Sequence, residues 1–473
     1  MRFRLAKCVW GEAYTETMLQ VNLPSLLAPA NLPTAASRHA IEHVIYTTPA
    51  DAAVIRDHPA FRAVAAVAKT RIEAIGFDSA PGAEDYHEAT IPRMNAVHNR
   101  ILEECHAEGS VWLFDQPDHV WGDGSLSWLA ETAATTRSCV VFPGIRTVKE
   151  HVVPELLRRA RPDGTIVVAN RDLARLAMEG MHIHDAGRLW GSGTATVWPH
   201  HVSWPAAPHA MLRRAFFTQP FAIAPPAGVG AERSVDMHYL ARAFPDPDSL
   251  HFVRDSDDFF VLEVSARFHV DDSNPHPLTV PLIGSFAAAI CDDYQLACFE
   301  RTIRMHAGGI PETMWRRAER RSERVRRGVL AYRALHALRV HLERIGYPAA
   351  RTLRRLLAGD MPSAWRGVPM PRTILLPSSP VLGAELDGSP AMLLGLVSAE
   401  PLPAEGPNAA GELPLLDGHR LSWRRVGGVL TLNDRIAATS AGEVAGMGLL
   451  RLSGDLGTAL TGSALAPPTL SDH

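Results

Sequence analysis

The chain has 473 residues, 46% of them hydrophobic and 21% charged, so its composition is that of an ordinary globular protein with room for two or three domains. Its formal net charge of −4 argues against a dedicated nucleic-acid-binding protein. Five widely spaced cysteines without metal-finger spacing, no signal-peptide pattern and no membrane-spanning apolar run together favour a reduced, cytoplasmic protein without a transmembrane segment.

Strand and helix patterns alternate along the first part of the chain. Apolar strand patterns occur at Phe3–Trp10, Ala40–Thr47, Thr70–Phe77, Val111–Phe114 and Ser138–Phe142. Amphipathic helix patterns lie between them, at Tyr14–Leu27, Pro49–Val67, Tyr86–Glu108 and Leu126–Thr135. This alternation predicts βαβ units, and therefore an α/β fold with a mostly parallel sheet flanked by helices.

An acidic loop follows the fourth predicted strand. It contains Asp115 and Asp118, then Asp123 between two glycines, and Ser125 can cap the next helix. Ligands of α/β sheets gather where strands end, and carboxylate oxygens suit hard divalent cations. We therefore predict that Asp115, Asp118 and Asp123 bind Mg²⁺ or Mn²⁺. Pro-Asp and Asp-Gly are also common turn dipeptides, so turns without a metal are the alternative.

The chain lacks a phosphate-binding glycine loop after its first strand. Gly191-Ser192-Gly193 is an isolated fragment, and no P-loop with its lysine occurs. A parallel α/β sheet with acids after the fourth strand, but without such a loop, points to nucleotide-sugar chemistry. In that chemistry a divalent cation neutralises the diphosphate of the donor.

The middle of the chain is rich in histidine and tryptophan. A helix predicted at Leu173–Met181 precedes His182 and His184, which would share one face of a strand and could chelate a metal. Hydrogen-bonded loop histidines are the alternative. The neighbouring cluster, which includes His201 and Trp204, suits the stacking of an acceptor sugar.

Ala210–Ile223 is predicted to be one extended strand. Its Arg213 and Arg214 could bind phosphate or form a solvated edge. A second acidic element, Asp255-Ser256-Asp257-Asp258, lies between strands predicted at Leu250–Val253 and Phe259–Val264. Its Asp-x-Asp spelling rivals the first loop as a metal site, and a β-turn is the alternative.

The composition changes near Pro275. We predict a helical extension over residues 276–360, with long helices at Phe286–Met305 and Glu312–Ile345, after a first domain of residues 1–275. The second helix is covered with arginine, which can bind RNA or anionic lipid headgroups and leaves peripheral membrane contact open. Interleaved Glu319 and Glu323 favour a solvated helix with i,i+4 ion pairs.

Residues 361–473 are rich in Pro, Gly, Leu and Ala and are predicted to form a small irregular or β appendage. Short strand-like runs occur at Leu421–Arg424 and Val429–Leu432, and the tail from about Gly457 has the composition of a disordered segment.

About the first 265 residues resemble a bacterial family of glycosyltransferase-like proteins with the nucleotide-diphospho-sugar transferase (GT-A) fold, several of which are encoded with polysaccharide-biosynthesis genes. The resemblance lies in the order and spacing of several short matches. These are Val9–Tyr14, Leu23–Leu27, Tyr46-Thr47, Pro117–Ser125 and Asp255–Asp258.

The resemblance implies a nucleotide pocket formed by Trp10, Gly11, Glu12 and Tyr14, and a donor-diphosphate site at Asp115–Asp118. This chain departs from the family at one place. A His-x-His-Pro often follows an Arg-x-Phe there, whereas this chain has Phe217, Thr218, Gln219 and Pro220. If those histidines serve catalysis or metal binding, the departure implies an altered or inactive site.

These observations favour a metal-assisted glycosyltransferase that moves a sugar from a nucleotide-sugar donor to a glycan or glycolipid acceptor. Asp257 or His201 would accept the proton of the acceptor hydroxyl if the reaction inverts. Trp204 and Arg213 would contact the substrates. One alternative is a non-catalytic sugar- or nucleotide-binding or scaffold module derived from such a domain. Another is a metal-dependent hydrolase that uses His182, His184 and the aspartates.

Overall fold

The computed structural model describes residues 1–76, 90–136, 138–232, 234–235, 238–267, 273–274 and 277–345, and beyond them only the strands between Val381 and Leu452. The chain forms two compact units. The first comprises Met1–Gly191, Pro199–His269 and Ala289–Gly328, and the second comprises Ser192–Trp198, Val270–Ala288 and Val329–His473. This division differs from the predicted boundaries, because residues 289–328 of the predicted helical extension belong to the first unit.

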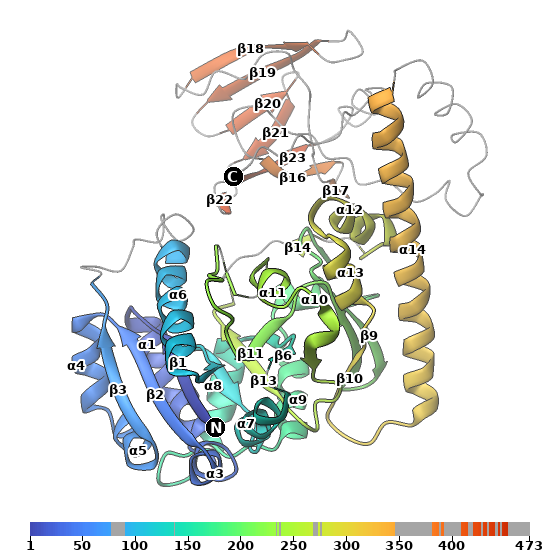
Figure 1. The fold of residues 1–473 in the computed structure, drawn as a ribbon. Coiled ribbons are helices and arrows are strands. Elements are labelled where there is room, and N and C mark those ends of the chain that lie inside the picture. The colour runs from blue at the N-terminus through green and yellow to red at the C-terminus, as the bar shows by residue number, and fades with distance from the viewer. Residues whose placement is uncertain are drawn as a thin grey trace. The chain divides into compact units, whose positions relative to one another are not determined.

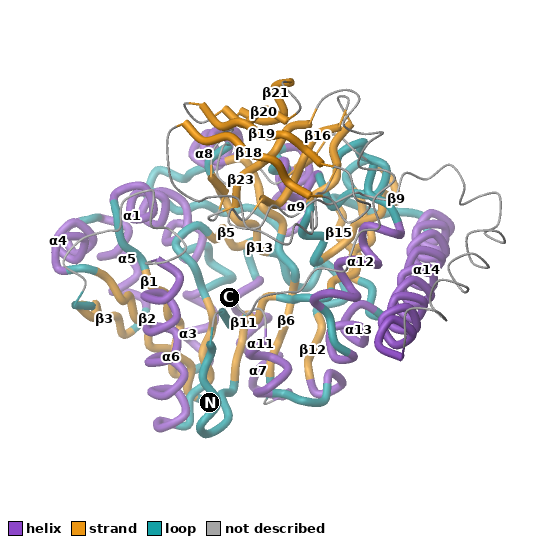
Figure 2. Tube along the Cα trace, turned by 90° about the horizontal axis from the view of Figure 1, so that it is seen from above, coloured by secondary structure: helices purple, strands orange, loops and turns teal. Residues whose placement is uncertain are grey.

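A seven-stranded mixed sheet lies at the centre of the first unit (Figures 1 and 2). Its order is β12-β6-β11-β4-β1-β2-β3. The strands are β1 (Arg2–Cys8), β2 (Ala40–Thr47), β3 (Lys69–Ala74), β4 (Val111–Phe114), β6 (Cys139–Phe142), β11 (Gln219–Ile223) and β12 (Leu250–Phe252). Strand β11 alone runs against its neighbours, β4 and β6, and the other pairs are parallel. The predicted α/β fold with a mostly parallel sheet is thus confirmed.

The order of strands reverses beside β1. The chain places β2 on one side of β1, and then passes through α4 (Pro49–Asp57) and α5 (Pro59–Val67) to place β3 on the outer side of β2. After β3 it passes through α6 (Ile91–Glu108) to β4, on the other side of β1. Ligands of open α/β sheets bind outside the carboxyl ends of strands at such a reversal. The segments that follow Cys8 and Phe114 therefore lie where a ligand is expected.

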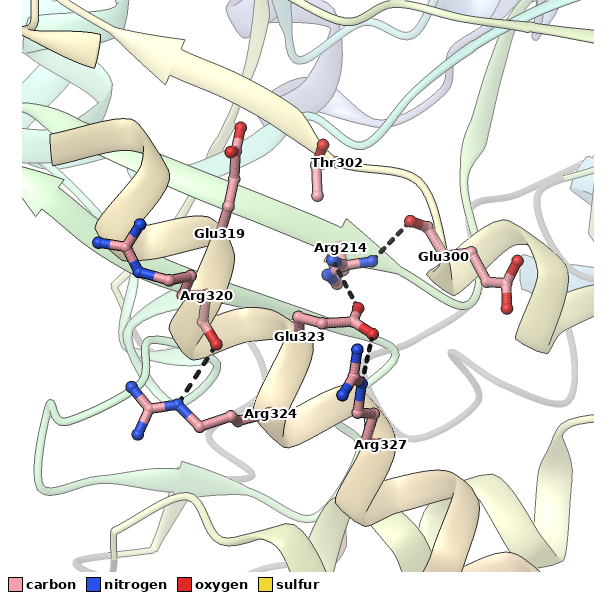
Figure 3. A pocket seen from close by; sticks show the side chains of 8 residues that line it. All are labelled: Arg214, Glu300, Thr302, Glu319, Arg320, Glu323, Arg324 and Arg327. Carbon is pink, nitrogen blue, oxygen red and sulfur yellow. Dashed lines mark hydrogen bonds and ion pairs between the residues drawn. The ribbon is translucent and has the colours of Figure 1, made fainter. Parts of the chain in front are cut away.

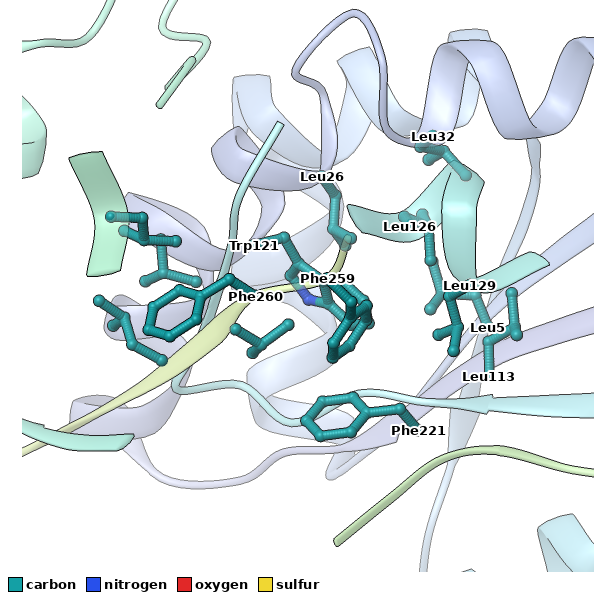
Figure 4. Packing of buried hydrophobic residues seen from close by; sticks show 14 of the residues in the cluster. Leu5, Leu26, Leu32, Leu113, Trp121, Leu126, Leu129, Phe221, Phe259 and Phe260 are labelled. Carbon is teal, nitrogen blue, oxygen red and sulfur yellow. The ribbon is translucent and has the colours of Figure 1, made fainter. Parts of the chain in front are cut away.

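Side chains of each strand alternate between the two faces of this sheet. Val111 and Leu113 of β4 belong to one apolar cluster, whereas Trp112 and Phe114 belong to the other. Helix α7 (Ser125–Thr136) contributes to the first cluster, and α6 with α11 (His238–Ala243) to the second, so helices cover both faces. The first cluster includes the packed residues of Figure 4: Leu5, Leu26, Leu32, Leu113, Trp121, Leu126, Leu129, Phe221, Phe259 and Phe260.

Two smaller sheets complete the first unit. In one, β13 (Val261–Ser265) is antiparallel to β5 (His119–Trp121) and parallel to β7 (Ile145–Val148). In the other, β10 (Ala210–Ala215) is antiparallel to β9 (His201–Ala207) and to β15 (Ile303–His306).

The strand predicted at Ala210–Ile223 is therefore two strands, β10 and β11, in different sheets. The backbone N–H groups of Phe216 and Phe217 bond to the carbonyl oxygen of His200, at 2.8 and 3.3 Å, and divert the chain between them.

Two predicted helices are also interrupted. The helix predicted at Pro49–Val67 ends at His58, whose side chain accepts the Ala60 N–H at 3.2 Å and begins α5. The helix predicted at Phe286–Met305 becomes α12 (Val280–Ile290), α13 (Asp293–Phe299) and β15, because Asp292 and Gln295 form a capping box. The long helix α14 (Glu312–Ile345) matches its prediction.

The second unit contains most of α12, the end of α14 and ten described strands. The Ser285 hydroxyl lies 3.0 Å from the hydroxyl of Tyr332, which joins the two helices. Strands β8 (Ala195–Thr196) and β14 (Ser273–Asn274) form a two-stranded sheet, and the other eight strands form the sheets β17-β16-β23-β22 and β18-β19-β20-β21. Strands β19 (Arg420–Val426) and β20 (Val429–Leu432) confirm the short strands predicted there, and the tail from Gly457 lies outside the described residues. No described helix is both long and apolar enough to cross a membrane.

Candidate functional site

A polar cavity of about 150 Å³ lies at the carboxyl edge of the central sheet, where β6 ends and the reversed strand β11 begins. Histidines, arginines and acids dominate its wall. The lining residues are Pro143, Gly144, Arg146, His184, Asp185, Arg188, His200, His201, Phe217, Thr218, Gln219 and Glu263. All belong to the first unit, although they come from separate stretches of the chain.

Three polar residues lie side by side across the small sheet β5-β13-β7. Glu263 of β13 is paired with His119 on one side and with Arg146 on the other. Directly paired residues point to the same face of a sheet, so the three side chains form one row. An Arg146 nitrogen (Nη2) lies 2.8 Å from a Glu263 oxygen (Oε1). At the start of β11, the Gln219 amide nitrogen lies 3.2 Å from His119 Nε2 and extends this row.

Asp118 is a buried carboxylate beside this row. Its backbone carbonyl accepts the Val264 N–H at 2.9 Å, but within the described chain its carboxylate accepts no side-chain hydrogen bond. Burial raises the pKa of Asp118 to about 7, and the charge of Glu263 adds to this effect. The pKa of Glu263 is lowered, because Arg146 outweighs the opposing effect of burial. Asp118 can thus gain and lose a proton near neutral pH.

Asp185, in the short helix α10 (Ile183–Ala186), connects several segments of the cavity wall through hydrogen bonds. One carboxylate oxygen accepts bonds from His201 Nε2 at 2.7 Å and from Arg213 Nη2 at 3.0 Å. The other accepts the backbone N–H of Arg146 at 2.6 Å. The pKa of Asp185 is well below its usual range despite burial, because of Arg213 and His201. Burial and Arg213 hold the pKa of His201 well below its usual value, so this histidine is neutral.

Arg188 brings a second guanidinium to the cavity. It is 1% exposed, and its terminal nitrogens lie 2.6 and 2.9 Å from the ring nitrogens of His184. Burial, followed by the charge of Arg188, lowers the pKa of His200 well below its usual value. The wall thus combines the cations Arg146 and Arg188 with the neutral His200 and His201.

The three acids predicted to bind one metal do not come together. Asp115 is 1% exposed, is ion-paired with Lys7, and accepts bonds from Asn22 Nδ2, Trp121 Nε1 and the Gln116 N–H at 3.1, 2.9 and 3.0 Å. Burial opposes ionisation of Asp115, but Lys7 reverses this and lowers its pKa. The Asp123 carboxylate accepts the Ala30 N–H at 2.9 Å and fixes a turn. Of the three acids, only Asp118 lies beside the row formed by His119, Glu263 and Arg146.

The predicted nucleotide-binding residues Trp10, Gly11, Glu12 and Tyr14 follow β1 at the carboxyl edge, where the resemblance implies a pocket. Gly11 has a positive φ of 82°, and its N–H donates to Asp51 at 3.1 Å, which turns the chain into α1 (Glu12–Thr17). None of the four lines the cavity described above.

Two predicted substrate contacts are buried structural residues. Trp204 is 0% exposed and stacks on Trp190, with ring centroids 6.4 Å apart, so a sugar cannot reach its face. Arg213 is also 0% exposed and donates to Ser203 Oγ at 2.8 Å and to the Pro143 carbonyl at 3.2 Å, besides Asp185. Arg213 therefore positions the cavity wall instead of meeting a phosphate.

The predicted catalytic residues Asp257 and His201 lie in different places. His201 lines the cavity, whereas Asp257 lies in an exposed turn and accepts bonds from Arg171 at 2.9 and 2.5 Å. The predicted metal pair is also divided. His184 lines the cavity, whereas the buried ring of His182 accepts the His184 N–H at 3.2 Å and caps α10.

The sequence pattern does not single out Arg146, Arg188 or Glu263. Each is a single charged residue in an unremarkable stretch, and only the pairing of β7 with β13 places Arg146 beside Glu263. One sequence feature did point to this cavity. Phe217 and Gln219, where the chain departs from the resembling family, both line it.

A second cavity, of about 590 Å³, lies along the first half of α14 (Figure 3). It is lined by Arg214, Glu300, Thr302, Glu319, Arg320, Glu323, Arg324 and Arg327. Glu323 pairs with Arg326 and Arg327, and Glu319 with Arg304. The ion pairs within this helix match the solvated helix favoured by its sequence.

No protein-family model and no curated protein sequence matches the chain.

Proposed function

We propose that the first unit is a glycosyltransferase domain of the GT-A type, which transfers a sugar from a nucleotide-sugar to a glycan or glycolipid acceptor. Two features of the fold support this. The sheet reverses its order between β1 and β4, and the resemblance to glycosyltransferase-like proteins covers the segments that follow both strands. The observation that carries the proposal is the buried Asp118 beside a cavity that is lined by Glu263, Arg146 and Arg188.

The two arginines of the cavity and the neighbouring Asp118 suit separate roles in sugar transfer. The departing nucleoside diphosphate develops negative charge, which guanidinium groups such as Arg146 and Arg188 can stabilise by paired hydrogen bonds. An acceptor hydroxyl must lose its proton as the glycosidic bond forms. A carboxylate whose pKa is about 7, such as Asp118, is suited to accept that proton at neutral pH.

The metal predicted from the sequence does not fit its three acids. The carboxylate of Asp115 is occupied by Lys7, Asn22 and Trp121, and that of Asp123 by a backbone N–H. We therefore assign charge stabilisation to the arginines and route no step through a cation at this loop.

A specific observation favours a second candidate, a binding module without transferase activity. Phe217 and Gln219 line the cavity at the positions where the resembling family often has two histidines. If those histidines are needed for transfer, this chain binds a sugar or nucleotide without turning it over.

An assay of nucleoside diphosphate release tests the proposal. UDP-, GDP- and CDP-sugars are incubated with acceptor glycans and with wild-type protein or Asp118→Asn. We expect wild-type turnover with one donor, and a loss of at least a hundredfold in kcat in Asp118→Asn with donor affinity kept, since general-base groups contribute roughly that much. Donor binding without turnover by the wild-type protein would favour the binding module. Equal turnover by both proteins would refute the role of Asp118.

A further inference from the structure

The second acidic element meets a histidine at the edge of the sheet that β12 forms. Asp255 and Asp257 follow β12, and His306 ends β15. One ligand atom of each of the three lies within 4.8 Å of the others, and they form the one such group of three among the described residues. His306 Nε2 lies 3.0 Å from the Asp255 carboxylate and 3.9 Å from that of Asp257, so this nitrogen faces both acids.

The backbone holds these side chains in place without any ligand. The Arg304 N–H donates to Arg254 O at 2.8 Å, and the Ser256 N–H donates to Arg304 O at 2.9 Å. The His306 N–H donates to Ser256 Oγ at 3.0 Å. The His306 ring is 8% exposed and lies against Trp315, at a centroid distance of 5.8 Å. The histidine is therefore fixed, while the carboxylates of Asp255 and Asp257, which are 35% and 36% exposed, reach solvent.

The chemistry of the donors selects the class of ligand. An imidazole nitrogen with two carboxylate oxygens suits Mn²⁺ or Zn²⁺ better than Mg²⁺ or Ca²⁺, which prefer oxygen alone. The turn also carries excess negative charge. Asp258 adds a third acid within four residues.

The guanidinium group of Arg171 would compete with a metal ion for one of these acids. Arg171 donates two hydrogen bonds to Asp257, at 2.9 and 2.5 Å, and its side chain is 53% exposed. Since it lies at the surface, Arg171 can turn into solvent when a divalent ion binds.

We propose that Asp255, Asp257 and His306 bind one divalent transition-metal ion, Mn²⁺ or Zn²⁺, which displaces Arg171 from Asp257. The ion links the turn after β12 to the end of β15. This site is separate from the cavity and does not depend on the proposed transferase activity.

Calorimetric titration of the full chain with MnCl₂ and with ZnCl₂, without nucleotide, tests the site. The titrations are run at pH 8, because an imidazole binds a metal only in its deprotonated form. We expect one ion per chain for at least one of the two metals. Asp257→Asn and His306→Gln should each weaken its binding at least tenfold. The matched control Asp258→Asn, which removes a neighbouring charge but no ligand, should change affinity less than threefold.

Arg171→Gln provides a test with the opposite sign, because a misfolded variant would bind the metal more weakly and not more strongly. Removal of the competing cation should strengthen metal binding roughly two- to fivefold, the range expected for an exposed ion pair. No saturable binding of either metal by the wild-type chain would overturn the proposal. So would equal affinity in Asp257→Asn and wild type, or unchanged or weaker binding in Arg171→Gln.

Discussion

Two aspartates three positions apart in one loop have opposite environments. Asp115 faces Lys7 and is held ionised, whereas Asp118 faces Glu263 and keeps its proton up to about pH 7. From the sequence both were equivalent metal ligands. Their difference comes from partners in other strands, Lys7 in β1 and Glu263 in β13, which the loop itself does not specify.

The raised pKa of Asp118 has a consequence for stability. Between about pH 4 and pH 7 the folded chain holds this proton more tightly than the unfolded chain, so the stabilising effect is complete below pH 4 and is lost as pH rises through 7. Asp118→Asn removes the cost of ionising a buried acid. We expect the variant to be more stable than wild type at pH 8, by an amount on the order of 2 kcal/mol, and equally stable at pH 4.

Urea unfolding of both proteins across this pH range checks the prediction. A stability difference that is the same at pH 4 and pH 8 would show that the pKa of Asp118 is not raised.

Lys7 and Asp115 form a fully buried ion pair, which Asn22 joins by a hydrogen bond to each partner. Lys7→Met should destabilise the fold by about 3–5 kcal/mol, because it leaves a buried carboxylate uncompensated. The double variant Lys7→Met/Asp115→Asn should recover part of this loss in urea unfolding. If the single variant costs less than 1 kcal/mol, the pair does not have the buried geometry described.

At the scale of elements, hydrophobic pattern predicted best where one element was long or fully apolar. The strands β1, β2 and β4 and the helix α14 were expected almost as they occur. The pattern failed where a local contact overrides a continuous apolar run. His200 divides Ala210–Ile223 into strands of two sheets, and Asp292 begins a new helix where one long helix was expected. The row of His119, Glu263 and Arg146 depends on strand pairing, which periodicity cannot predict.

Asp185 joins α10 to strands β7, β9 and β10 through Arg146, His201 and Arg213. Asp185→Asn should destabilise the protein by about 3 kcal/mol, because Arg213 would lose its buried counter-charge. The exposed Asp172, in α9 (Asn170–Glu179), offers a control, and Asp172→Asn should cost less than about 0.5 kcal/mol. Denaturant unfolding of both variants measures the difference, and equal costs would contradict the role given to Asp185.

For the first unit as a whole, the sequence predicted an acidic loop at the carboxyl edge of the sheet, but not the side chains that line the cavity there. Strand order places the ends of β1 and β4 side by side, and the acidic loop lies at this edge as expected. The sequence predicted metal-binding acids at this edge, but the charged side chains are arranged differently. Arginines and histidines line the cavity, while the one described group with three metal-ligating side chains lies beyond β12. In the proposed transferase, arginine side chains would therefore take the role that the sequence pattern assigns to a metal.

We propose that this cavity binds the diphosphate of the donor, and equilibrium binding tests this role most directly. UDP-, GDP- and CDP-sugars are titrated by calorimetry, with EDTA present, into wild type, Arg146→Gln and the control Arg158→Gln. Arg158 lies in α8 (Lys149–Arg158), is 69% exposed and pairs with Glu155 away from the cavity lining. We predict that one donor binds wild type and Arg158→Gln alike, and binds Arg146→Gln at least tenfold more weakly, or about 1.4 kcal/mol. Absence of binding by every donor, or equal binding by Arg146→Gln and wild type, would contradict the account.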